Sequence, residues 1–186
     1  MSTSFKPTRE QIQAAYGRTV PDVIAPRLKV LFCGINPGLY SGAVGHHFAR
    51  PGNRFWKALH QGGFTPRLLS PFEERALLDW GYGITNLVPR STAVATELAP
   101  AELVAGAEVL ATKVELYAPR CVAVLGLGAY RTAFRRPDAG IGLQPEMLGP
   151  AQLWVLPNPS GLNGHYQLPQ LAELFGELRQ TVVQEC

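Results

Sequence analysis

The chain has 186 residues, 46% of them apolar and 17% charged, a composition that indicates a globular domain with a real core and excludes a disordered chain. Its apolar runs are too short to cross a bilayer, and we expect no secretory signal. Three dispersed cysteines with no CxxC pair argue against zinc, iron–sulfur and disulfide frameworks and favour a reducing cytoplasm, while a formal net charge of +3 permits binding to a polyanion without requiring it.

Short apolar strands alternate with amphipathic helices along most of the chain. Residues 1–18 are expected to be an N-terminal extension, either frayed or carrying a short helix over 8–16, and residues 19–186 a single domain. Strands are predicted over 28–33, 84–88, 121–125 and 153–156, and helices over 53–61, 70–79, 100–117 and 168–182. The third of these strands is the run from Cys121 to Leu125, and the second helix begins at a Ser70-Pro71-Phe72-Glu73 capping box. This alternation predicts an α/β fold of three layers (α/β/α), with a short, mostly parallel central sheet between the helices.

Parallel sheets of this kind place ligands beyond the carboxyl ends of their strands, and a glycine-rich loop follows the first predicted strand. The loop reads Gly34-Ile35-Asn36-Pro37-Gly38. Its two glycines let backbone N–H groups approach a ligand closely, and Pro37 stiffens the turn. The amide of Asn36 can accept from a water and donate to a ligand, although it is no strong base. A plain turn with a structural asparagine is the alternative interpretation.

Two further segments carry candidate binding residues. Phe48 lies in irregular chain, where a flat ring can stack on a base, whereas Phe55 and Trp56 are expected in the core. The adjacent His46 and His47 make a poor metal pair, and we expect them in a solvated loop. After the last strand, Leu162 is a lone large apolar residue among glycines and polar residues. It either tucks into the core or acts as a wedge that fills the gap left by an extruded base.

Three motifs together resemble the mismatch-specific uracil-DNA glycosylases and the related thymine-DNA glycosylases. They are GINPG, the segment from Phe48 to Lys57 (FARPGNRFWK), and the segment from Trp154 to Leu162 (WVLPNPSGL). They occur in that family's order and spacing, and the resemblance runs from about Pro21 to the last helix. It implies a uracil-DNA glycosylase-like fold and an enzyme that removes uracil, or other damaged or mispaired pyrimidines, from DNA.

The resemblance also implies roles for particular residues. Asn36 would position the attacking water, and Phe48 would stack on the extruded base. The implied base pocket consists of Gly34, Ile35, Pro37, Gly38 and Phe48; Asn86 is added to it below on chemical grounds, not by the resemblance. The implied loop for intercalation and backbone contact consists of Asn158, Ser160, Gly161, Leu162 and Asn163. No metal or cofactor is implied. We expect a monomer bound to double-stranded DNA that contains uracil or mismatches, with single-stranded DNA as a further candidate, no membrane contact, and a location in the bacterial cytoplasm with the nucleoid.

Two departures from the family bear on specificity. Asn163-Gly164-His165 follows the wedge leucine where the bacterial mismatch enzymes often carry an arginine, so mismatch dependence stays open. Asn86 stands on its strand where close relatives carry a lysine. An amide both donates and accepts, which suits N3–H and O4 of uracil, so Asn86 is predicted to line the pocket. A structural asparagine at a strand end is the alternative.

Rival interpretations involve other residues. Asp79 is the candidate for a catalytic carboxylate, although capping or pairing at a helix end explains it as well. Gly126 and Gly128 follow a strand as in a dinucleotide fold, but Arg131 stands where the third glycine of the fingerprint belongs. No lysine occupies a motif position suited to a Schiff base, which predicts a monofunctional enzyme that leaves an abasic site. A DNA-damage binding protein without catalysis remains the alternative to an enzyme.

Overall fold

The computed structural model describes residues 5–184 and is built on a five-stranded sheet with the order β2-β1-β3-β5-β4. Strands β1 (Val30–Gly34), β2 (Tyr82–Asn86), β3 (Cys121–Leu125) and β5 (Ala151–Leu156) run parallel to their neighbours. The edge strand β4 (Gly142–Leu148) is antiparallel to β5. The mostly parallel central sheet predicted from the sequence is therefore confirmed.

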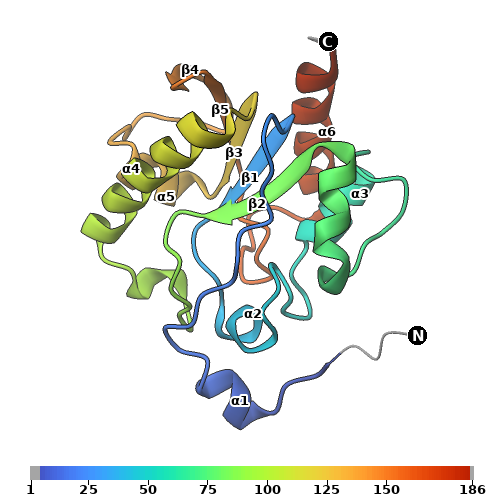
Figure 1. Cartoon of the computed structure of the whole chain (residues 1–186), viewed down its shortest axis with the longest axis vertical. Helices are drawn as coiled ribbons and strands as arrows, with labels where there is room; N and C mark the ends of the chain where they lie inside the picture. Colours follow the sequence, from blue (N-terminus) through green and yellow to red (C-terminus); the bar gives the residue numbers. More distant parts are fainter. Residues whose placement is uncertain (1–4, 185–186) are drawn as a thin grey trace.

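Helices cover both faces of this sheet. Every residue of β1 is buried, and since successive side chains of a strand point to opposite sides, both sides of β1 are shielded from solvent. Val30 and Phe32 pack into one core, which includes residues of α3 (Phe55–Gln61), α6 (Leu168–Gln184) and the 3₁₀ helix η1 (Pro71–Trp80). Leu31 and Cys33 pack into a second core with α4 (Pro100–Tyr117) and α5 (Leu127–Ala133). Figure 1 shows these two helical layers on either side of the strands.

Several elements differ from the sequence prediction. Strand β2 begins at Tyr82 and ends at Asn86, whereas the prediction was 84–88. Beyond its end, Leu87 N donates to the carbonyl oxygen of Gly34, the last residue of β1, and Val88 N donates to Ile35 O in the loop that follows β1. The capping box at Ser70 is present, with Ser70 N donating to Glu73 Oε2 at 2.9 Å, but the helix that it opens is 3₁₀ rather than α.

Some elements have no counterpart in the sequence prediction, namely β4, α5, the short helix α2 (Leu39–Val44) and the 3₁₀ turn η2 (Ala95–Glu97). Strand β4 lacks the usual signal because it is an edge strand that contains Pro145 and exposes Leu143 and Met147. Its alternating exposure replaces the continuous apolar run that marks the buried parallel strands.

The N-terminal segment contacts the loop after β2. Helix α1 (Arg9–Gln13) is followed by the fully buried Ala15. Gly17 N donates to Ser91 O and Ser91 N donates to Arg18 O, both at 2.9 Å. The segment is thereby hydrogen-bonded to the loop that also borders the site described below. Within residues 5–184, no helix is long and apolar enough to span a membrane.

Candidate active site

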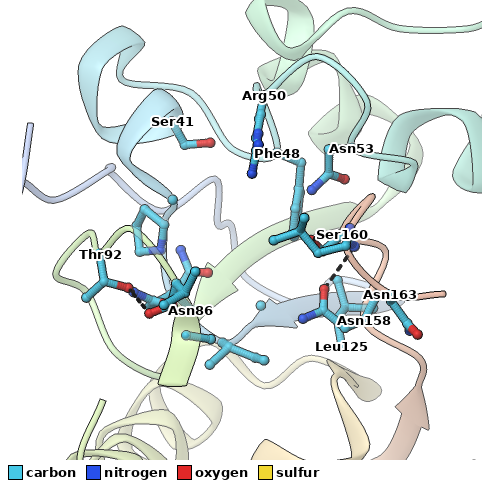
Figure 2. A pocket seen from close by; sticks show the side chains of 18 of the residues that line it. Ser41, Phe48, Arg50, Asn53, Asn86, Thr92, Leu125, Asn158, Ser160 and Asn163 are labelled. Atoms are coloured by element: carbon cyan, nitrogen blue, oxygen red, sulfur yellow. Dashed lines mark hydrogen bonds between the residues drawn. The ribbon is translucent and has the colours of Figure 1, made fainter. Parts of the chain in front are cut away.

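A cavity of about 570 Å³ opens at the carboxyl edge of the sheet, beyond the ends of β1 and β2. Eleven of the residues predicted from the sequence line it: Gly34, Ile35, Asn36, Pro37, Gly38, Phe48, Asn86, Asn158, Ser160, Leu162 and Asn163. Figure 2 shows that the side chains around this space come from the segment between β1 and α3, from the end of β2 and the loop after it, from the end of β3, and from the loop after β5. The topology therefore brings together motifs that are more than 100 positions apart in the sequence.

Asn36 is held by both hydrogens of its amide. Its Nδ2 donates to Arg90 O at 3.0 Å and to Thr92 Oγ1 at 2.8 Å. Thr92 Oγ1 donates its own hydrogen to Val94 O at 2.9 Å, so toward Asn36 it can only accept. This network assigns the amide orientation. The amide oxygen of Asn36 remains as an acceptor, which suits a water molecule.

The loop that carries Asn36 is hydrogen-bonded to the loop after β2 along its length. Leu87 N donates to Gly34 O at 2.9 Å, and Thr92 N donates to Pro37 O at 3.1 Å. Thr92 is buried, with 1% of its surface exposed. Sequence reasoning missed Thr92, although its place shortly after a strand that ends at the same sheet edge was a usable signal.

The side chains of Phe48 and Asn86 both lie close to the backbone of Gly34. A Cβ placed on Gly34 would lie 2.5 Å from Asn86 Oδ1 and 3.3 Å from Phe48 Cζ. Phe48 has a φ of 52°, a left-handed conformation that costs a non-glycine residue about 1 kcal/mol. Its ring stacks on Phe55 with centroids 4.1 Å apart, so one ring face is covered while the ring also lines the cavity. Such strain persists where surrounding packing imposes it and is frequent at functional sites.

His47 orients the amide of Asn86. His47 Nε2 donates to Pro21 O at 2.8 Å, so its Nδ1 bears the lone pair and accepts from Asn86 Nδ2 at 3.4 Å. Burial lowers the pKa of His47, against the opposing effect of the Glu74 carboxylate, and favours the neutral ring. With its nitrogen directed to His47, Asn86 keeps its oxygen beside Gly34.

The expectation that His46 and His47 lie in a solvated loop is wrong for His47, which is only 2% exposed. The buried Glu74 of η1 binds both residues. Its Oε2 accepts from His47 N at 2.8 Å, and its Oε1 lies 2.9 Å from His46 Nδ1. The segment around His47 is therefore held against the protein by the carboxylate of Glu74, 27 positions away, and no local sequence pattern predicts such a contact.

The loop after β5 presents Leu162 to solvent. This side chain is 69% exposed, so it does not tuck into the core. Polar side chains of the loop hold its backbone: Asn158 Oδ1 accepts from Ser160 N at 3.0 Å, and Asn163 Nδ2 donates to Asn158 O at 3.0 Å. Figure 2 shows Asn158, Ser160 and Asn163 close together on one side of the cavity. We call residues 158–166 the wedge loop from here on.

Two predicted site residues do not line the cavity. Gly161 instead approaches the neighbouring chain, where a Cβ would lie 2.9 Å from Gly52 O. Asp79 is exposed near the end of η1. No aspartate or glutamate is among the described residues that line the cavity, and no cluster of three or more metal-binding side chains occurs within residues 5–184.

These features define a class of protein: a three-layer α/β fold whose cavity, at the carboxyl edge of the sheet, combines an anchored amide, a stacking aromatic ring and an exposed apolar loop tip. A model of the Uracil DNA glycosylase superfamily matches residues 21–181. The chain belongs to this superfamily. Membership indicates DNA glycosylase activity and DNA as the substrate.

A solved structure has a similar fold. It is the solution NMR structure of a protein from Methanosarcina acetivorans named "putative Uracil DNA glycosylase". The match has a TM-score of 0.53 and 16% sequence identity, and it covers 88% of this chain and 98% of that chain. At this identity the likeness supports the fold assignment, and the residues of the site are argued from their own geometry.

Proposed function

We propose that this protein extrudes uracil from DNA into the cavity and hydrolyses the bond between N1 of the base and C1′ of deoxyribose. The observation that carries the proposal is the anchored amide of Asn36, whose two hydrogens are engaged by Arg90 O and Thr92 Oγ1. It lines the same cavity as Phe48, Asn86 and the exposed Leu162. Asn36 can hold the attacking water, Phe48 and Asn86 can bind the base, and Leu162 can enter the duplex.

Base selection follows from two side chains. The ring of Phe48 offers a stacking surface for any base. Asn86 Oδ1 can accept from N3–H of uracil, and its Nδ2 can donate to O4. Cytosine presents an acceptor at N3 and a donor at N4, so it would require the reversed amide. The lone pair on His47 Nδ1 opposes that reversal, because it accepts from Asn86 Nδ2.

Extrusion costs a few kcal/mol and is cheapest for a mispaired base or a single strand. Leu162, which is 69% exposed, would occupy the space that the base leaves. A mispair therefore favours excision without any contact to the partner base. The proposed substrates therefore include mismatched pyrimidines and uracil in single strands.

Cleavage passes through a sugar with oxocarbenium character, as in other glycoside hydrolysis. The leaving base takes negative charge, which backbone N–H groups of the Gly34–Gly38 loop stabilise. The oxygen of the water bound to Asn36 Oδ1 bonds to C1′ of the sugar, and the proton that this water releases neutralises the departed uracil anion. Because an amide does not take the proton as a carboxylate does, turnover is expected to be slow. No lysine is among the described residues that line the cavity, which supports an enzyme that leaves an abasic site without a covalent adduct.

The test is a single-turnover excision assay with wild type and Asn36→Ala on U·G, U·A and T·G duplexes and on single-stranded uracil. We expect uracil release by wild type and a loss of about 100-fold in the variant, because the attacking water loses its position. Gln61→Ala removes an exposed amide outside the cavity and serves as the matched control.

DNA binding by the Asn36→Ala variant should persist, since the wedge loop is unchanged. If wild type binds the four substrates but releases no base from any of them, the protein is a damage binder and the enzymatic proposal is wrong. Trapping of a covalent adduct with borohydride would contradict the monofunctional mechanism.

A further inference from the structure

Arg54 connects the segment that carries Phe48 to the wedge loop. It precedes α3, six residues after Phe48, and it is half-buried. Its backbone N–H donates to Pro159 O at 3.0 Å. Main chain and side chain of this residue thus both face the wedge loop, although they lie more than 100 positions before it.

The guanidinium of Arg54 uses four of its five hydrogens on backbone carbonyls of that single loop. Nε donates to Pro159 O at 3.3 Å, and Nη2 donates to Ser160 O at 2.6 Å and to Asn163 O at 2.9 Å. Nη1 donates to Tyr166 O. No carboxylate is paired with Arg54 among the described residues. The positively charged guanidinium therefore interacts with the carbonyl oxygens of the wedge loop and not with a carboxylate.

These hydrogen bonds bracket the wedge. The acceptors lie before Leu162 at 159 and 160 and after it at 163 and 166, so one planar group fixes both arms of the loop. Hydrogen bonds from a charged donor are stronger than neutral ones, and the fork geometry of arginine fixes direction as well. Backbone N–H groups also donate to two of these carbonyls, Asn163 N to Ser160 O and Arg54 N to Pro159 O, both at 3.0 Å. The carbonyls of Asn163 and Tyr166 accept from the guanidinium, and a neutral side chain has fewer N–H groups to offer them.

We propose that Arg54 is a positioning residue for base extrusion, which holds the wedge loop in the shape that inserts Leu162 into the duplex. The inference rests on the proposed function and adds a residue to its DNA-opening step. Arg54 acts through the loop and does not line the cavity. Its loss should therefore impair excision where extrusion limits the rate, and spare it where the base is already unpaired.

The test compares kcat/KM on a U·A duplex and on single-stranded uracil for wild type, Arg54→Gln, Arg54→Lys and Arg75→Gln. We expect Arg54→Gln to lose on the order of 10- to 100-fold on the duplex, since displacement of a positioned group by about 1 Å has this effect. On single strands the loss should stay below about threefold, so that extrusion and not chemistry is affected. Arg54→Lys should be intermediate, because it keeps the charge without the fork. Arg75, exposed on η1 and outside the cavity, is the matched control and should match wild type.

A double-mutant cycle with Leu162→Ala separates positioning from a general loss of structure. If Arg54 acts through the wedge, Arg54→Gln should have little further effect on the duplex once Leu162 is truncated. Additive losses, or equal losses on duplex and single strand, would overturn the inference while leaving the proposed function intact.

Failure of the proposed function has a different signature, because wild type itself would then release no uracil. In that case 2-aminopurine placed beside the uracil reports base unstacking on binding. Wild type should raise its fluorescence and Arg54→Gln should not. Equal fluorescence from the two proteins would also overturn the inference.

Discussion

Replacing Gly34 with alanine tests whether Phe48 and Asn86 form a base pocket. The added methyl would lie 2.5 Å from Asn86 Oδ1, about 0.9 Å short of the 3.4 Å at which ordinary contact begins. The side chain of Asn86 is the freer of the two partners, because the Phe48 ring is stacked on Phe55. We therefore expect the amide to move by most of that distance.

A displacement of this size at a positioned group lowers the rate by about 100-fold. Overpacking also lowers the free energy of unfolding, by about 1–3 kcal/mol. The assay is the single-turnover rate of uracil release at saturating enzyme, with thermal unfolding measured in parallel. Gly128→Ala is the matched control, since a Cβ there meets nothing within 4 Å.

In an Asn86→Ala background the same substitution should cost much less, because its main obstacle is gone. An unchanged rate of uracil release by a folded Gly34→Ala protein would refute the assignment of Asn86 to the base pocket. A melting temperature lowered in the wild-type background but not in the Asn86→Ala background, with no effect on the rate, would place the close approach in stability alone.

Two further predictions concern the groups behind the site. Thr92→Val removes the hydroxyl that accepts from Asn36 Nδ2 at 2.8 Å while keeping the side-chain shape. We expect kcat to fall about 10-fold with KM unchanged, since one hydrogen bond of roughly 1 kcal/mol is lost and a part-buried N–H of Asn36 is left without this acceptor. An equal fall in DNA affinity would argue against a role of Thr92 in positioning water. Burial lowers the pKa of His47 from 6.5, so as the pH falls through 6.5 the unfolded chain takes up a proton that the folded protein does not. The free energy of unfolding should therefore fall below pH 6.5, by up to about 1.4 kcal/mol per pH unit, and His47→Gln should flatten this dependence in urea titrations; a slope that persists in the variant would assign it to another group.

Local patterns in the sequence were sufficient for the layers of the fold. The apolar runs at 121–125 and 153–156 mark buried parallel strands, and Pro100 marks the start of a long helix. The capping box at Ser70 marks another helix start. Periodicity and turn chemistry act over a few residues, so they can be recognised without knowledge of the rest of the chain. Two motifs that follow strands, GINPG and the PNPSGL segment, then indicated one shared edge of the sheet.

Long-range packing decided how the site residues are held. Asn36 is oriented by acceptors that lie 54 and 56 positions away, and no spacing rule links them. Arg54 reaches a loop 105 to 112 positions further along the chain. His47 is buried because Glu74 and Pro21 accept its hydrogens.

The sequence by itself therefore indicated most of the side chains that gather at the carboxyl edge, though not Thr92, because the order of parallel strands and their loops brings those ends together. The tertiary structure alone decided which hydrogen each amide donates and which oxygen it leaves available. These choices depend on donors and acceptors from separate elements, whose separation is set by the packing of helices against the sheet. In Asn36 and Asn86 the amide nitrogen is held by partners from other elements, so the amide oxygen is left as an acceptor that points in a defined direction.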